Sequence, residues 1–250
     1  MSEKSVSKSR GWLWPAVIAG ILVVLLAVLS FPRGSSTTTA PESAPAEDAQ
    51  QAGEPAADVE AVGDPPDLSF IERRDPEDPL TAGHTNAPVA LTIFSDYQCP
   101  YCATWSNDTL PKMMEYADSG DLFIEWRDLN IFGEESERAS RAAYAAGLQG
   151  KFWEYHDELF PGGNIRSAGG LSEEALIALA DEVGLDTEKF KEDLTSQEVD
   201  DAVIENQNLG IDLGVYSTPG FVMGGEAIIG AQPTEVFVDA LEEALAEAGE

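Results

Sequence analysis

The whole cysteine content of this 250-residue chain is one local pair, Cys99 and Cys102, in the sequence Cys-Pro-Tyr-Cys. Two cysteines cannot cross-link a domain of this size into a disulfide scaffold, and no further thiol remains to pair elsewhere. Residues 88–95, just before the pair, are apolar and β-branched, which predicts a buried strand. The fold must therefore present two neighbouring thiols just beyond the end of a strand.

A strand that turns into a helix at Cys99 would place this sulfur at a helix N-terminus. Free backbone N–H groups and the helix dipole stabilise a thiolate there and lower its pKa. Pro100 suits the first helical turn, because that position needs no N–H group. The spacing of three puts Cys102 on the same helix face, close enough to attack a mixed disulfide at Cys99. The pattern favours thiol–disulfide exchange, with Cys99 as the exposed nucleophile and Cys102 as the resolving thiol.

Three other interpretations of the cysteine pair are disfavoured but stay open. A structural disulfide would close too short a loop to stabilise the fold much. A metal site would need more ligands than His84, His156 and carboxylates offer, so we expect neither a metal nor a cofactor. A Cys–His hydrolase would use His156, which lies among aromatic residues at helical spacing, where packing is the commoner role.

Residues 11–31 form an uncharged apolar run of 21 positions, long enough to cross a bilayer. Three basic residues precede the run and one, Arg33, closely follows it. This bias predicts residues 1–10 as a cytoplasmic tail and the rest of the chain as extracytoplasmic. We therefore expect a single-pass signal anchor in the lipid bilayer of the cell membrane. A cleaved signal peptide is the alternative.

Residues 32–66 are rich in Ala, Pro, Ser, Thr and acidic residues and contain no aromatic side chain. Such a segment cannot bury enough apolar surface to fold, so it predicts a disordered tether. Residues 67–250 are long enough for a sizeable core, and they carry 38 acidic and 10 basic residues. This charge repels nucleic acid, which excludes a nucleic-acid partner. Solubility explains the charge more simply than a preference for cationic partners.

The folded part is expected to follow the order β-α-β, a block of helices, and β-β-α. Residues 122–128 alternate apolar and polar, as a strand with one covered face does. Helical patterns fill about 135–212, and the last of them, at 186–212, is compatible with one helix or two. A hairpin is predicted at 221–229, followed by an amphipathic helix at 234–247.

A Ser-Thr-Pro-Gly turn at residues 217–220 directly precedes the predicted hairpin. A proline at the start of a strand cannot donate a ladder hydrogen bond, and it often marks a special turn, sometimes with a cis peptide bond. By itself this is an ordinary turn sequence. Its significance comes from its combination with the cysteine pair.

Three motifs together resemble the DsbA-like branch of the thioredoxin superfamily. They are the stretch 94–102 with the cysteine pair, the Lys-Phe-Trp-Glu-Tyr-His-Asp segment at 151–157, and Thr218-Pro219 before Phe221-Val222. The motifs occur in the family's order, and the resemblance spans residues 80–248. It implies an α/β thioredoxin-like fold with a helical insertion between its βαβ and ββα halves. The long gap between Cys102 and Pro219 leaves room for that insertion, and is far too long for a thioredoxin or glutaredoxin.

The resemblance also implies a cis bond before Pro219 and a position beside the cysteines for Thr218, whose backbone would pair with a substrate peptide as an added strand. It further implies an enzyme that introduces disulfides into reduced or unfolded secreted proteins and is reoxidised by a membrane-embedded partner. A reductase or isomerase of the same fold and a non-catalytic chaperone-like binding module stay open, because a sequence does not give a reduction potential.

Many relatives place a buried glutamate six residues before the first cysteine, where this chain has Ile93. Asp96 lies nearer the pair and could substitute in part, but an aspartate there more often shapes a loop. Tyr101 and Trp105 are expected near the rim, where they either form an apolar collar for unfolded substrates or simply pack. The predicted catalytic residues are Cys99, Cys102, Thr218 and Pro219, and their predicted neighbours are Pro100, Tyr101, Asp96 and Trp105.

Overall fold

The computed structural model describes residues 66–249. The predicted cytoplasmic tail, the signal anchor at 11–31 and the tether as far as residue 65 lie outside the described residues. Within the part that is described, no helix combines the length and the apolar character needed to cross a membrane.

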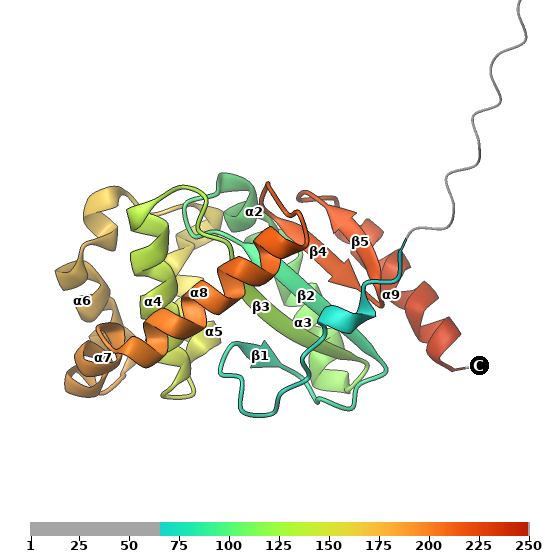
Figure 1. Cartoon of the computed structure of the whole chain (residues 1–250), viewed down its shortest axis with the longest axis horizontal. Coiled ribbons are helices and arrows are strands. Elements are labelled where there is room, and N and C mark those ends of the chain that lie inside the picture. Colours follow the sequence, from blue (N-terminus) through green and yellow to red (C-terminus); the bar gives the residue numbers. More distant parts are fainter. Residues whose placement is uncertain (1–65, 250) are drawn as a thin grey trace, which may run out of the picture. The chain divides into compact units, whose positions relative to one another are not determined.

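A five-stranded sheet forms the centre of the described domain, with the strand order β1-β3-β2-β4-β5 (Figure 1). The central strands β2 and β3 run parallel, and each of the other neighbouring pairs is antiparallel. The strands are β1 (Thr81–Ala82), β2 (Val89–Ser95), β3 (Leu122–Asp128), β4 (Gly220–Met223) and β5 (Glu226–Ile229). The hairpin predicted at 221–229 is confirmed as β4 and β5. The two-residue strand β1 was not predicted, because so short a segment has no periodicity to detect.

Helices cover both faces of this sheet. One face packs against α2 (Pro100–Asp108), α3 (Leu110–Ser119) and α9 (Thr234–Ala248), which share one apolar core with it. On the other face lies α8 (Gln197–Asp212), whose Leu209 packs near Phe94 and Val222. The close approach of α8 requires Gly210, because a Cβ atom there would lie 3.0 Å from Leu129 Cδ1 and 3.2 Å from Phe94 Cδ1.

Five helices connect β3 to β4, and four of them form a group beyond one end of the sheet (Figure 1). That group consists of α4 (Glu134–Gly147), α5 (Phe152–Leu159), α6 (Glu173–Val183) and α7 (Thr187–Leu194), and α8 returns the chain to the sheet. Three short 3-10 helices complete the described chain, at Ser69–Ile71, Pro161–Gly163 and Ala168–Leu171.

Local capping residues explain where the later helices begin and end. Ser172 accepts a hydrogen bond from the Ala175 N–H at the start of α6, and Gly184 ends that helix in the left-handed conformation. Asp186 and Ser196 cap α7 and α8 in the same way. These two caps separate the helices, so the segment predicted at 186–212 is two helices rather than one.

Strand β3 differs from the prediction of one covered face, because all seven of its residues are buried. Leu122, Ile124 and Trp126 join the main apolar core. The alternate polar residues Glu125 and Arg127 are fully buried on the opposite face, beneath the segment that leads into the domain. The polar half of the alternating pattern therefore does not mark a solvent-exposed face in this strand.

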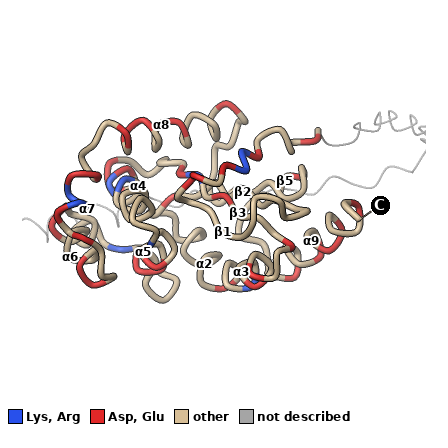
Figure 2. Tube along the Cα trace, turned by 90° about the horizontal axis from the view of Figure 1, so that it is seen from below, with Lys and Arg blue, Asp and Glu red and all other residues tan. Residues whose placement is uncertain are grey.

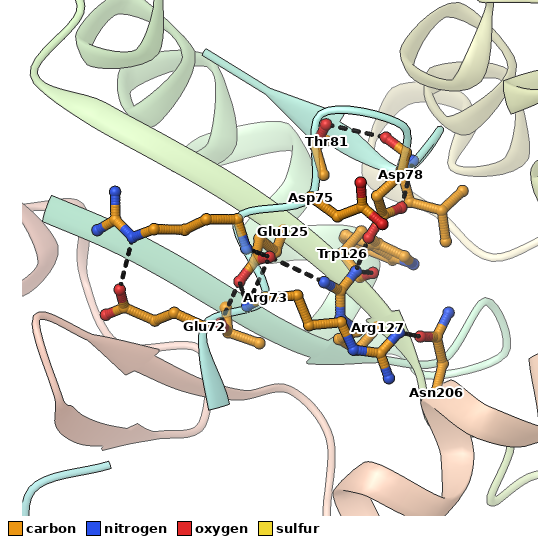
Figure 3. Close-up of polar contacts among 12 residues, drawn as sticks. Glu72, Arg73, Asp75, Asp78, Thr81, Glu125, Trp126, Arg127 and Asn206 are labelled. Carbon is orange, nitrogen blue, oxygen red and sulfur yellow. Dashed lines mark hydrogen bonds and ion pairs between the residues drawn. The ribbon is translucent and has the colours of Figure 1, made fainter. Parts of the chain in front are cut away.

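An ionic cluster makes the burial of Glu125 and Arg127 possible (Figure 3). Arg127 Nη2 lies 3.0 Å from Glu125 Oε1, and Arg127 Nη1 lies 2.8 Å from Asp78 Oδ2. Glu125 also accepts hydrogen bonds from the backbone N–H of Arg73 at 3.1 Å and of Arg74 at 2.9 Å. Buried charges persist where they are paired and hydrogen-bonded in this way. The cluster fastens residues 73–78 to the sheet.

Candidate active site

Cys99 is the N-cap residue of α2, with φ −88° and ψ 116°, and Pro100 occupies the first helical turn. Strand β2 ends four residues earlier, at Ser95. The predicted arrangement of a strand, a short loop and a helix N-terminus at the first cysteine is therefore confirmed. It directs free backbone N–H groups of the first helical turn towards the Cys99 sulfur.

Asp96 shapes the loop between β2 and α2. Its Oδ1 accepts hydrogen bonds from Gln98 N–H at 2.7 Å and from the Ser136 hydroxyl at 2.6 Å, and its Oδ2 accepts one from Phe132 N–H at 3.1 Å. The side chain is fully buried, and burial raises its pKa. These contacts support the predicted loop-shaping role of Asp96.

The two thiols are free and differ strongly in acidity. The pKa of Cys99 is lowered from 9.0 to about 6, chiefly by a hydrogen bond from the Cys102 thiol. Hydrogen bonds from Thr218 and from the N–H groups of Cys102 and Tyr101 also lower this pKa, whereas burial raises it. Burial, together with the neighbouring Cys99, raises the pKa of Cys102 well above its ordinary value. At neutral pH the pair therefore consists of a Cys99 thiolate and a Cys102 thiol.

The loop before β4 lies against the first cysteine. In its protonated form the Cys99 thiol donates a hydrogen bond to the Thr218 carbonyl oxygen at 3.2 Å, across 119 positions of sequence. The Thr218–Pro219 peptide bond is cis, as the resemblance implied. Cys99 is only 2% exposed, less than predicted, because this loop covers part of the sulfur. The structure thus brings all four predicted catalytic residues together, and their catalytic roles stay predictions.

Two predicted neighbours separate into a rim residue and a core residue. Tyr101 is 69% exposed beside the cysteines. Trp105 is buried, and its ring centroid lies 4.7 Å from that of Phe221 and 5.4 Å from that of Phe237. Trp105 therefore packs in the core, and the alternative prediction that it belongs to a substrate-binding rim is wrong. A substrate contact for Tyr101 stays a prediction.

His156 lies in an aromatic part of the core near the pair. Its Nδ1 is 3.2 Å from the Tyr97 hydroxyl, and its ring centroid is 4.4 Å from that of Trp126. Burial lowers the pKa of His156 to about 3, so the ring is neutral at physiological pH. The predicted packing role is what these contacts show. Among residues 66–249 no group of three or more His, Cys, Asp and Glu side chains is placed to hold a metal ion.

Asp128 is a second buried acid near the cysteines, and no sequence motif predicted its position there. Asp128 ends β3 and pairs in register with Ser95, at the end of β2. Burial raises its pKa to about 6. Its only sequence signal is its place at the end of an alternating strand, and that signal becomes informative only when the register to β2 is known.

Known proteins resemble the part of the chain that contains this site. Residues 90–242 match the family model of the DSBA-like thioredoxin domain. The chain is 28% identical over 148 residues to "Probable disulfide bond formation protein D" of Bacillus cereus, a match that covers 57% of this chain and 68% of that protein.

Solved structures agree with the observed fold. A thioredoxin-like oxidoreductase from Silicibacter pomeroyi DSS-3 is similar with a TM-score of 0.57 and 29% identity, over 68% of this chain and 98% of that one. Oxidised BdbD from Bacillus subtilis is similar with a TM-score of 0.60 and 23% identity, over 67% of this chain and 92% of that one. The second likeness shows the fold alone. The expected α/β thioredoxin-like fold of the described domain is confirmed.

Proposed function

This chain belongs to the DSBA-like thioredoxin domain family of thiol–disulfide oxidoreductases, and on that basis we propose that it introduces disulfide bonds into reduced secreted or cell-surface proteins. Cys99 is the nucleophile of the proposed reaction and Cys102 is the resolving thiol. The observation that carries the proposal is the position of Cys99 at the N-terminus of α2 against the Thr218 carbonyl, with the pKa of Cys99 lowered to about 6 and that of Cys102 raised.

A low pKa at Cys99 favours donation of the disulfide rather than its reduction. At pH 7, lowering the pKa from 9.0 to about 6 stabilises the reduced form by about 1.4 kcal/mol, because the thiol ionises more completely. For a two-electron couple this corresponds to a potential about 30 mV more oxidising. Stabilising the reduced form of the pair makes its disulfide a stronger oxidant.

The reaction proceeds in two exchanges. A substrate thiolate attacks Cys99 Sγ, the Cys99–Cys102 bond breaks, and Cys102 leaves with the bonding electron pair and takes up a proton. A second substrate thiolate then attacks the substrate sulfur of the mixed disulfide, and Cys99 leaves as a thiolate. The substrate loses two electrons and the enzyme gains them. Because a thiolate of low pKa is a good leaving group, the second exchange is favoured.

The surface around Cys99 suits unfolded polypeptide. Tyr101 and Tyr216 are exposed, and each lies two residues from a residue of the Cys99–Thr218 contact. Residues 97–107 and 213–225 carry no charged side chain, although the chain has a net charge of −32. Figure 2 shows acidic positions along the other helices, among them α3, α5, α6, α8 and α9. An apolar, uncharged rim accepts exposed apolar side chains of many different substrates.

The proposed location is the outer side of the cell membrane. The apolar run at 11–31 and its basic flank support this location, since disulfides form and persist outside the cytoplasm. A membrane-embedded partner would return the pair to the disulfide form after each cycle. Both proposals rest on the sequence.

The test is oxidation of a reduced, unfolded ribonuclease by the purified full-length chain carrying the Cys99–Cys102 disulfide. Cys99→Ser should abolish disulfide formation. Cys102→Ser cannot hold the intramolecular disulfide, but once its Cys99 has been converted to a mixed disulfide with glutathione, attack of a substrate thiolate on Cys99 Sγ should release glutathione and leave a stable mixed disulfide with the substrate. Undiminished oxidation by Cys99→Ser would contradict the proposal. Equilibration of the pair with glutathione gives its potential, and a value near the roughly −270 mV of a thioredoxin would favour a reductase instead.

A further inference from the structure

A buried polar compartment lies beneath Cys102. Ser95 and Asp128 are neighbours at the ends of the parallel strands β2 and β3, and they are 1% and 0% exposed. Because side chains alternate along a strand, both point to the sheet face that carries Ile93 and Trp126, which belong to the main core with both cysteines. The compartment is therefore on the same side of the sheet as the pair.

Ser95 connects this compartment to the resolving thiol. Hydrogen bonding from the Ser95 side chain favours the thiolate form of Cys102. The same side chain stands next to Asp128 across the β2–β3 pair, where adjacent strands lie about 4.8 Å apart. A hydroxyl can donate one hydrogen bond and accept another at the same time. Ser95 makes no hydrogen bond to Asp128 in this structure, so the relay requires a rotation of the Ser95 side chain that carries its hydroxyl from the Cys102 sulfur to the neighbouring carboxylate.

Asp128 has an oxygen available for that proton. Its Oδ1 accepts a hydrogen bond from the Trp126 indole N–H at 3.0 Å. Its Oδ2 is buried and has no hydrogen-bond partner within the described part of the chain. A buried carboxylate oxygen without a partner is costly, so its presence calls for a reason. Burial raises the pKa of Asp128 to about 6, with Asp96 adding to the rise and Trp126, Ser140 and Arg127 opposing it.

The other ionisable groups that face the compartment do not supply a proton acceptor near neutral pH. Both oxygens of Asp96, in the loop after β2, already accept hydrogen bonds. Burial raises the pKa of Tyr97 well above 10.0, and burial lowers that of His156 on α5 to about 3. Arg127 points to the opposite face of the sheet, into the ionic cluster. Asp128 alone among these groups combines a free oxygen with ionisation close to neutral pH.

We propose that Asp128 accepts the proton of the Cys102 thiol through the Ser95 hydroxyl and returns it in the reverse step. The inference deepens the proposed thiol–disulfide exchange and rests on it. Asp128 is a positioning residue that acts through Ser95. Many relatives have a buried glutamate on β2, where this chain has Ile93, and we assign the role of that glutamate to Asp128 on β3.

When Cys102 attacks Cys99 Sγ in a mixed disulfide, its proton passes to the Ser95 oxygen while the Ser95 proton passes to the Asp128 carboxylate. The new Cys99–Cys102 bond forms, the old disulfide bond at Cys99 breaks, and the other thiolate leaves with the electron pair. In the oxidising direction Cys102 leaves Cys99 as a thiolate and receives the proton from the Asp128 carboxylic acid by the same route.

The test uses the reduced full-length chain, oxidised glutathione in excess, rapid acid quenching and mass spectrometry. These follow the unimolecular conversion of the Cys99–glutathione mixed disulfide to the Cys99–Cys102 disulfide across the pH range. The wild-type rate should rise as the pH passes through about 6, where Asp128 ionises. Asp128→Asn and Ser95→Ala should lose this inflection and slow the step at pH 7 by about tenfold or more. Asp157→Asn, which removes an exposed carboxylate on α5, should retain the wild-type profile.

Two further measurements separate this role from a structural one. The pKa of Cys99 should stay near 6 in Asp128→Asn, and the variant should melt at a higher temperature than wild type at pH 7, because burial opposes the ionised aspartate. An Asp128→Asn profile that keeps the inflection would overturn the role of Asp128 and leave the proposed function intact. A wild-type chain that forms no mixed disulfide with glutathione would overturn the proposed function and this inference together.

Discussion

The pKa of Cys99 offers a quantitative test of the site, because its largest cause is a single hydrogen bond from the Cys102 thiol. Cys102→Ala removes that donor and leaves the backbone N–H groups of α2 in place. A hydrogen bond to a charged group contributes about 1.5–3 kcal/mol. At 1.36 kcal/mol per pH unit, its loss should raise the pKa of Cys99 from about 6 to between about 7 and 8.

The matched control is Cys102→Ser, whose hydroxyl still donates a hydrogen bond from the same position. Its Cys99 pKa should stay close to 6. Each variant contains a single thiol, so the ultraviolet absorbance of the thiolate and the rate of alkylation by iodoacetamide both report Cys99 alone. Titration of the two variants side by side measures the contribution of the donated bond.

Equal pKa values in the alanine and serine variants would refute the hydrogen bond as the main cause and would leave the helix N-terminus as the source of the lowered value. A pKa near the ordinary 9.0 in both variants and in wild type would refute the wider reasoning, including the oxidising character proposed for the pair.

Four further predictions test other parts of the structure. The reduction potential should fall by about 59 mV per pH unit below pH 6 and by about 30 mV per pH unit above pH 6. The slope halves because Cys99 takes up no proton on reduction above its pKa. A single slope across this range would contradict the lowered pKa of Cys99. Arg127→Met should lower the free energy of unfolding in urea by about 3–5 kcal/mol, because Glu125 stays buried without its charged partner. Adding Glu125→Leu should restore only part of the loss, because the N–H groups of Arg73 and Arg74 then lose their acceptor. Trp105→Ala should lower the free energy of unfolding by about 3–5 kcal/mol, whereas the same truncation of an exposed side chain would lower this free energy far less. Asp128→Asn should raise the free energy of unfolding by up to about 3 kcal/mol at pH 7. The pKa of Asp128 is raised from 3.8 to about 6 in the folded protein, so the wild-type chain loses stability as the pH rises through that interval. The gain in the variant should therefore disappear below about pH 4.

Features that depend only on neighbouring residues could be predicted from the amino-acid sequence. The apolar β-branched run before Cys99, the proline after it and the spacing to Cys102 were sufficient to predict a strand followed by a helix that begins at the first thiol. Hairpin and helix positions followed in the same way from glycines, capping side chains and hydrophobic periodicity. These signals are local because backbone dihedral angles and amphipathic faces are set within a few residues.

The tertiary structure decided what covers each face and which distant groups meet. β3 carries an alternating pattern, yet residues 73–78 and α8 cover its polar face, where Arg127 forms ion pairs with Asp78 and Glu125. Trp105 could have lain at the rim or in the core, and its contacts with Phe221 and Phe237 decided the matter. Asp128 reaches the cysteine pair only through the register of β3 against β2. Contacts of this kind depend on how remote segments pack, and no local pattern encodes that packing.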